Sequence, residues 1–141
     1  MPDKLDNVHP LLAAKARKIL EIAKGEGFDL RVVQGLRTFA EQDALFRQRP
    51  RVTRARGGQS YHNYGLAVDF GFFVNGKYDG NDLSLYKRIE AWATTVGLEW
   101  GGNWKSFKDL PHVQLPNAPK TSECLALMKA KGLNTVWLRW K

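Results

Sequence analysis

Apolar residues recur at helical spacing in several stretches of the chain. In the first of these they form a single stripe, with Pro10 suited to a first helical turn and Gly25 to the end of the helix. Thr38 and Glu41 have the spacing of a capping box, which indicates the beginning of a second helix. The pattern predicts helices over residues 11–24, 38–48, 82–96 and 123–131.

Shorter stretches alternate between apolar and polar residues, as expected of strands with one face in a core. In the clearest of them, Ala67 and Asp69 fall on one face, and the apolar residues beside them fall on the other. Asn75-Gly76 follows and favours a tight hairpin turn. Short strands and helices mixed in this order predict an α+β fold with a small antiparallel sheet. The predicted strands span residues 30–34, 65–73, 98–100 and 113–115.

The composition indicates a single globular domain over residues 1–141. Of the 141 residues, 43% are hydrophobic and 26% are charged, so the chain has enough apolar material for a core and differs from a disordered chain. Its one cysteine, Cys124, excludes an intramolecular disulfide, and we expect it to be a buried apolar residue. No apolar signal segment or membrane span is visible, which predicts a protein made in the cytoplasm without a signal peptide and without stable membrane insertion.

The charge balance is strongly basic. The chain has 22 Lys and Arg against 14 Asp and Glu, and this net charge of +8 predicts attraction to polyanions. Nucleic acid, an anionic membrane surface and an anionic cell-wall polymer are all compatible with it. The basic residues are dispersed apart from one cluster, which we interpret as a solvated loop in preference to a nucleic-acid-binding arm. The cluster consists of Arg47, Arg49, Arg51, Arg54 and Arg56.

Two short segments contain the candidate chemistry. Zinc used in catalysis binds three side chains of His, Asp or Glu and leaves a fourth position for water. His62, Asp69 and His112 meet that requirement. Asp109 lies three residues before His112, and Pro111 between them favours a bend that lets both side chains approach one metal ion. Asp109 then becomes the candidate general base.

Each of these residues also has an ordinary structural explanation. A lone histidine is more often a hydrogen-bonded core or surface residue than a ligand, and Asp69 could cap a turn. The spacings match no strong short zinc motif. His9, beside Pro10, is interpreted as structural.

Three segments together resemble a known family. They are Val33-Gln-Gly-Leu-Arg-Thr38, Gly57-Gly-Gln-Ser-Tyr-His-Asn-Tyr-Gly-Leu-Ala-Val-Asp69 and Trp100-Gly-Gly-Asn-Trp-Lys-Ser-Phe-Lys-Asp-Leu-Pro-His112. In this order they resemble the VanY-like zinc peptidases, and within that group the L-alanyl-D-glutamate peptidases of phage endolysins and bacterial autolysins. The resemblance implies a fold of the hedgehog/DD-peptidase type.

The resemblance also implies a role for each motif residue. His62, Asp69 and His112 correspond to the ligands of a Zn²⁺ ion. Asp109 corresponds to the catalytic base, which would take a proton from the attacking water and return it to the leaving amine. Arg37 corresponds to the cation that stabilises the oxyanion.

The resemblance implies that the protein is a peptidoglycan hydrolase that cleaves the stem peptide at the L-alanyl-D-glutamate bond. The nearer of two alternatives is a D-Ala-D-Ala carboxypeptidase or dipeptidase, which uses the same zinc chemistry. The remote alternative is a noncatalytic basic domain that binds nucleic acid. The resemblance to small, single-domain endolysins implies a monomeric phage lysis enzyme without a separate wall-binding domain or a nucleic-acid partner. Such an enzyme would reach the wall through a pore protein, or holin.

Overall fold

An antiparallel five-stranded sheet is the centre of the fold. The computed structural model describes residues 3–106 and 108–140, and its strands pair in the order β1-β2-β5-β4, with β3 also pairing with β2. Together with the helices this confirms the predicted α+β class. The strands are β1 (Asp29–Gln34), β2 (Ala67–Val74), β3 (Lys77–Asp79), β4 (Glu99–Trp100) and β5 (His112–Gln114).

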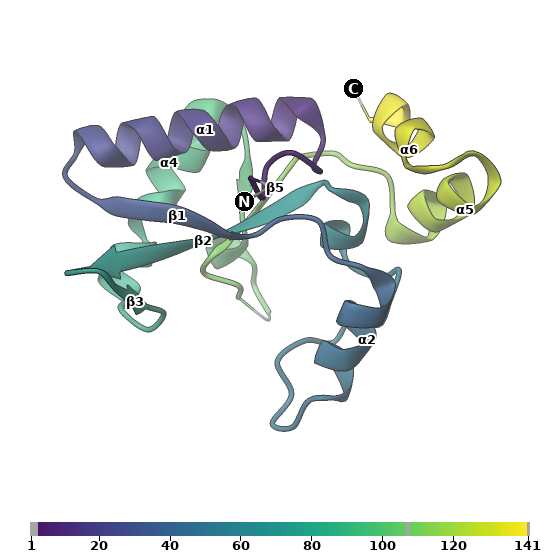
Figure 1. The fold of residues 1–141 in the computed structure, drawn as a ribbon, viewed down its shortest axis with the longest axis horizontal. Helices are drawn as coiled ribbons and strands as arrows, with labels where there is room; N and C mark the ends of the chain where they lie inside the picture. Colours follow the sequence, from purple (N-terminus) through teal and green to yellow (C-terminus); the bar gives the residue numbers. More distant parts are fainter. Residues whose placement is uncertain (1–2, 107, 141) are drawn as a thin grey trace.

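Helices cover one face of this sheet. Figure 1 shows α1 and α4 above the strands, α2 extending below them, and α5 and α6 together at one end. Two short 3-10 turns, η1 and η2, precede β2 and follow β4. The helices are α1 (Pro10–Gly25), α2 (Phe39–Arg47), α3 (Leu83–Tyr86), α4 (Arg88–Val96), α5 (Thr121–Lys131) and α6 (Leu133–Arg139), and the turns are η1 (Tyr61–Tyr64) and η2 (Gly101–Asn103).

β2 separates the core from the polar face. Val68 and Phe70 are fully buried in the core, whereas the side chain of Asp69 between them is 16% exposed. Asp69 pairs with Gln34 of β1 on one side and with His112 of β5 on the other. The alternation read from the sequence therefore places the carboxylate on the polar face, opposite the core.

The core lies between the sheet and the covering helices. Leu12 and Ile19 of α1 are fully buried, and Phe72 of β2 contacts the rings of Tyr86 and Trp92 at centroid distances of 5.0 and 6.0 Å. Burying one such large side chain stabilises the fold by about 1.5–3 kcal/mol. This packing provides the rigid support for β2.

The predicted helix over 82–96 is wrong in one respect, because two helices meet there with Lys87 between them. In the first of these helices Leu85 is only partly buried, whereas Tyr86 is buried in the core. The Tyr86 hydroxyl donates a hydrogen bond to the Asp79 carbonyl at 2.8 Å, which requires this side chain to turn inward.

Local signals elsewhere are confirmed. Thr38 caps α2 with Glu41 as its capping-box partner, and Asn75-Gly76 forms the turn between β2 and β3. Cys124 is a buried free thiol, as predicted. His9 is structural, since its ring accepts a hydrogen bond from the Leu11 amide at the start of α1.

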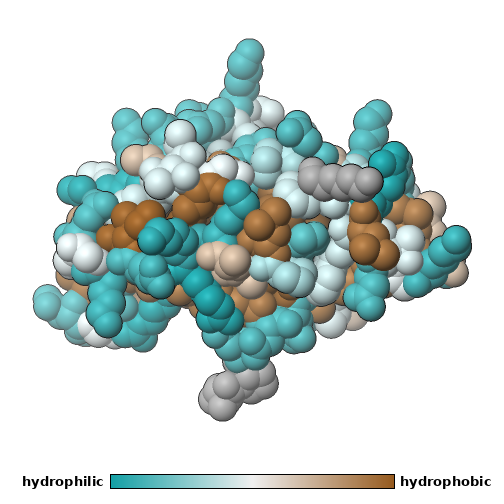
Figure 2. Space-filling view, turned by 90° about the horizontal axis from the view of Figure 1, so that it is seen from above, coloured by the Kyte–Doolittle hydropathy of each residue, from teal (hydrophilic) through white to brown (hydrophobic). Residues whose placement is uncertain are grey.

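The C-terminal residues pack onto the domain through α6. The indole of Trp137 donates to the Tyr64 carbonyl at 2.7 Å, and that of Trp140 donates to the Pro116 carbonyl at 2.6 Å. In Figure 2, hydrophilic residues cover much of the face above α1, with apolar residues in separate areas. Among the described residues, no helix has the length and apolar character needed to cross a membrane.

Candidate metal centre

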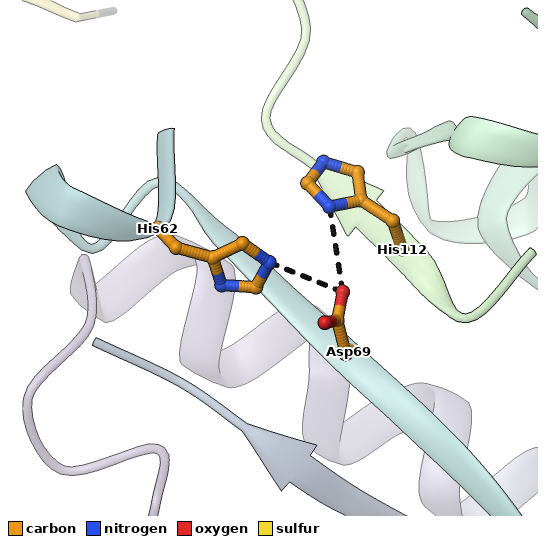
Figure 3. A group of neighbouring side chains, drawn as sticks. All are labelled: His62, Asp69 and His112. Atoms are coloured by element: carbon orange, nitrogen blue, oxygen red, sulfur yellow. Dashed lines mark hydrogen bonds and ion pairs between the residues drawn. The ribbon is translucent and has the colours of Figure 1, made fainter. Parts of the chain in front are cut away.

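The three predicted ligands come from three different elements and meet on the polar face of the sheet. His62 lies on η1, Asp69 on β2 and His112 at the first position of β5. In Figure 3 the two imidazole rings approach the Asp69 carboxylate from either side. The local turn that presents His62 begins at Ser60, whose side chain accepts a hydrogen bond from the His62 amide.

A glycine completes that turn. Gly65 has φ +66°, and a Cβ there would lie 3.1 Å from the Asn7 carbonyl oxygen. The left-handed conformation and the close backbone both favour glycine. η1 therefore ends abruptly, and the chain enters β2 within two residues of the turn.

The donor atoms are close enough to share one ion. His62 Nε2 lies 3.1 Å and His112 Nδ1 lies 3.4 Å from the same Asp69 oxygen. All three ligand atoms lie within 4.8 Å of one another. The sequence pattern placed these residues in one site, and the fold brings them together.

In each of the two histidines, the ring nitrogen that points away from Asp69 makes a hydrogen bond. This bond fixes the orientation of the ring and so determines which nitrogen faces the site. His62 Nδ1 donates to the Gly35 carbonyl at 3.0 Å, and His112 Nε2 donates to Gln114 Oε1 at 2.7 Å. Each inner nitrogen is then left with a lone pair, as a metal ligand needs. Within the described part of the chain, buried His112 Nδ1 has no hydrogen-bond partner. The imidazole of His62, that of His112 with its unpartnered nitrogen, and one carboxylate fit a divalent metal ion, which binds histidine as the neutral ring.

The carboxylates of the site differ in their surroundings. Burial alone would raise the pKa of Asp69, but the imidazoles of His62 and His112, which attract the ionised carboxylate when they are protonated, outweigh burial and hold that pKa far below its usual range. Burial raises the pKa of Asp109 despite the opposing effect of His112. Asp69 is therefore an ionised ligand, and Asp109 holds a proton more readily than an ordinary aspartate.

Asp109 lies beside the triad because the chain bends before β5. The His112 amide donates to the Asp109 carbonyl at 3.2 Å, so the two residues belong to a turn that contains Pro111, as predicted. Asp109 Oδ2 is 3.7 Å from His112 Nδ1. The Asp109 amide also donates to the carbonyl of Gly101 at 3.1 Å, which ties this turn to η2.

Arg37 lies between the end of β1 and the start of α2. Its amide donates to the His62 carbonyl at 2.9 Å, which joins this junction to η1. In the side chain, Nη2 is 3.8 Å from Asp69 Oδ2, and Nη1 donates to Gln42 Oε1 at 2.8 Å. The guanidinium is thus held at the edge of the triad by one hydrogen bond and one ion pair.

Gln42 is a supporting residue that the sequence reasoning missed. This side chain of α2 is fully buried, and its Nε2 donates to the Ala55 carbonyl at 2.8 Å while its Oε1 holds Arg37. The sequence contained one signal of this role, a polar residue on the inward side of a packing helix. It could not identify the two partners of Gln42, because they lie in other segments.

A second supporting group was also missed. Gln114, which holds His112, donates to Glu99 at 3.2 Å, and the indole of Trp104 donates to the same carboxylate at 3.1 Å. The Trp104 ring lies 5.0 Å from the His112 ring between centroids. Gln114 follows His112 by two residues on one strand, so the shared face could have indicated this contact.

The triad opens into a cavity of about 400 Å³. Tyr61 and Trp104 line it, whereas Tyr64 and Trp100, which also flank the motifs, belong to the core. The loop after α2 also lines this cavity, at Val52, Thr53 and Ala55. Arg37, Asp109 and the three ligands also line this cavity, so all five predicted site residues face the same space.

Comparison with known proteins gives consistent matches. Residues 53–115 match the M15 peptidase family model described as D-alanyl-D-alanine carboxypeptidase. A peptidoglycan L-alanyl-D-glutamate endopeptidase of Bacillus subtilis, CwlK, is 41% identical over 126 residues, which cover 79% of this chain and 75% of that protein. An L-alanyl-D-glutamate peptidase of Escherichia phage T5 is 31% identical over 112 residues, covering 75% of this chain and 79% of the relative.

A solved structure shares both fold and sequence similarity with this chain. The L-Ala D-Glu endopeptidase ChiX of Serratia marcescens superimposes with a TM-score of 0.66 at 30% identity. The match covers 79% of this chain and 83% of that one. The described sheet and helices are thus those of a known peptidase architecture.

Proposed function

Because the chain belongs to the M15 family of metallopeptidases, we propose that it hydrolyses peptidoglycan stem peptides at the bond between L-alanine and D-glutamate. The bond is the one in the names of the Bacillus, phage and Serratia proteins. The observation that carries the proposal is the convergence of two histidines and one aspartate, with an unpartnered inner nitrogen, in a cavity that also contains Asp109 and Arg37.

Zn²⁺ is the proposed metal, held by His62 Nε2, His112 Nδ1 and a carboxylate oxygen of Asp69. Zinc bound by three such ligands supplies a Lewis acid and lowers the pKa of a water molecule from 15.7 to about 7. The Gly35 carbonyl and Gln114 keep both histidines in the tautomer that binds metal.

Asp109 is the proposed general base and acid. It takes a proton from the attacking water as the oxygen adds to the carbonyl carbon of L-alanine. It then gives that proton to the glutamate nitrogen as the C–N bond breaks, so the proton balance closes on one carboxylate. Its position in the cavity, 3.7 Å from His112, supports this role.

Arg37 is the proposed electrostatic stabiliser of the reaction. Negative charge develops on the alanine carbonyl oxygen as water adds, and a fixed guanidinium beside that oxygen stabilises it. Gln42 and Asp69 hold the Arg37 side chain in place, so little reorganisation is needed during the reaction.

A D-Ala-D-Ala carboxypeptidase is the second candidate, favoured by the description of the matching family model. The same metal and base would serve it, because the two activities differ in the bond that the cleft receives. Four other expectations from the sequence stay predictions. They are a single-domain organisation, a monomeric state, the absence of a nucleic-acid partner and release through a holin.

Fragment analysis of digested peptidoglycan tests the proposal. The zinc-loaded protein should lower the turbidity of purified sacculi, and mass spectrometry should find peptides with a new N-terminal glutamate. Release of free D-alanine without such peptides would favour the carboxypeptidase instead. A chelator should stop the reaction and added zinc should restore it. Undiminished release in chelator would exclude the metal mechanism.

A further inference from the structure

A chain of hydrogen bonds leads from the metal site to a carboxylate on the neighbouring strand. His112 Nε2 lies 2.7 Å from Gln114 Oε1, and Gln114 Nε2 lies 3.2 Å from Glu99 Oε2. The indole of Trp104 donates to the same Glu99 oxygen at 3.1 Å. His112, Gln114 and Trp104 line the metal cavity, so Glu99 is linked to the site through residues that face it.

The pairing of β4 with β5 places three of these side chains in one row. Gln114 follows His112 by two positions on β5, so both side chains lie on the same face of the strand. Glu99 of β4 lies directly opposite Gln114 in the antiparallel ladder, and opposite side chains share a face at short range. The next opposite pair, Trp100 and Val113, is buried in the core. The row therefore crosses the polar face of the sheet.

The middle member of the row is an amide, which can present either of two ends to the histidine. Its oxygen accepts a hydrogen bond and its nitrogen donates one, and a half-turn about the last side-chain bond exchanges them. An ionised carboxylate, by contrast, can only accept. The Glu99 carboxylate therefore binds the Nε2 end of Gln114 and leaves the Oε1 end for His112.

The orientation of this amide determines the tautomer of His112. An acceptor beside Nε2 favours a proton on Nε2, and the neutral ring then has its lone pair on Nδ1, which lies 3.4 Å from Asp69. In Figure 3 the other ring nitrogen points away from that carboxylate. The reversed amide would place a donor beside Nε2 and favour a proton on Nδ1. A metal ion at Nδ1 requires the first arrangement.

We propose that Glu99 is a positioning residue that fixes the amide of Gln114 and thereby keeps His112 in the tautomer that binds zinc. The inference rests on the proposed function, and it adds a residue that acts on the ion through Gln114 and His112. Trp104 supports the arrangement, because its indole binds the Glu99 oxygen that accepts from Gln114.

Zinc affinity, measured by competition with a chromophoric chelator, tests this role separately from hydrolysis. Glu99→Ala removes the acceptor, so the zinc dissociation constant should rise by about tenfold, at the low end of the range for groups that orient metal ligands. Glu99→Gln keeps an oxygen acceptor and should lose less affinity. Glu90→Ala is the matched control, because it removes the same charge from an exposed position on α4, which covers the other face of the sheet. It should leave the dissociation constant unchanged.

A second substitution separates positioning from a purely structural role. Gln114→Glu puts a carboxylate beside His112 Nε2, and this group needs no orienting partner because both of its oxygens accept. In the Glu99→Ala background it should restore the wild-type dissociation constant. In the wild-type background it sets two carboxylates opposite each other, so it should bind zinc less tightly than the double variant.

Two results would overturn the role of Glu99. One is an unchanged dissociation constant in Glu99→Ala, with the wild type binding zinc and hydrolysing sacculi. The other is a change of the same factor on Gln114→Glu in both backgrounds, because the two positions would then act independently. A wild-type protein that binds no zinc would instead overturn the proposed function, and the inference with it.

Discussion

Replacing Gln42 by leucine should damage the site without touching any motif residue. Leucine fills nearly the same volume but removes both hydrogen bonds of the buried amide, one to the Arg37 guanidinium and one to the Ala55 carbonyl. Arg37 would keep only the longer contact with Asp69 at 3.8 Å. The guanidinium should then lose its fixed position.

The expected size follows from these two contacts. A hydrogen bond to a charged group contributes about 1.5–3 kcal/mol and a neutral one about 0.5–1.5 kcal/mol. The apolar surface that leucine buries offsets about 1 kcal/mol of the stability lost with these hydrogen bonds. The free energy of unfolding should fall by about 2 kcal/mol, which corresponds to about 6–8 °C in Tm for a domain of this size. Because Arg37 is displaced but still present, kcat should fall by about 10- to 100-fold.

Kinetics on a soluble stem peptide, thermal unfolding and bound zinc should be measured together. Zinc content should stay near wild type, since Gln42 contacts none of the three ligands. Gln48→Leu is the control, because Gln48 ends the same helix at an exposed position. Gln42→Glu keeps an acceptor for Arg37 but sets a carboxylate against the Ala55 carbonyl. It should therefore retain more kcat than the leucine variant while losing stability.

A double-mutant cycle can refute this reasoning. If Gln42 acts through Arg37, the leucine change should cost nothing further in kcat once Arg37→Ala is present. The idea is wrong if Gln42→Leu lowers kcat by the same factor in both backgrounds. It is equally wrong if the folded single variant keeps wild-type kcat.

Three further outcomes are expected. His62→Ala and His112→Ala should each lower bound zinc in metal analysis, and full occupancy in either variant would remove that histidine from the site. Asp109→Asn should keep zinc but lose about 10²–10⁴-fold in hydrolysis, so wild-type turnover would contradict the base assignment. Exposed charges are screened over about 8 Å at physiological ionic strength, so activity on sacculi should fall with added salt. Arg49→Gln with Arg51→Gln should reproduce that loss at low salt and spare soluble peptides, whereas a salt-independent rate would leave these arginines without a steering role.

Much of the fold could be predicted because its signals are local. The capping box at Thr38, the turn at Asn75-Gly76 and the alternation around Asp69 each depend on neighbouring residues. The division of the helix at Lys87 was not predictable in this way, because it accommodates a hydrogen bond from Tyr86 to another segment.

The candidate site shows the same difference between what local signals predict and what depends on contacts between distant segments. Residue types and order identified the ligands, but no spacing rule could show that His62 and His112, 50 positions apart, flank one carboxylate oxygen. Gln42 shows the limit most clearly. Its role depends on Arg37 and on a loop beyond the end of α2. The helical pattern therefore shows that position 42 is polar, but it does not show which groups the side chain contacts.

The contact between Gly101 and the Asp109 turn affects how the cleft can be engineered. A Cβ at Gly101 would lie 2.4 Å from the Asp109 carbonyl oxygen, and one at Gly102 would lie 2.1 Å from the Trp100 ring. Side chains at either position require the backbone or the indole to move. In a saturation mutagenesis library selected by bacterial lysis, both glycines should therefore tolerate substitution as poorly as Asp109 does. Neither glycine is assigned a chemical step. Pairing the selection with a measure of protein abundance would separate them, and libraries intended to alter bond preference should leave both glycines fixed.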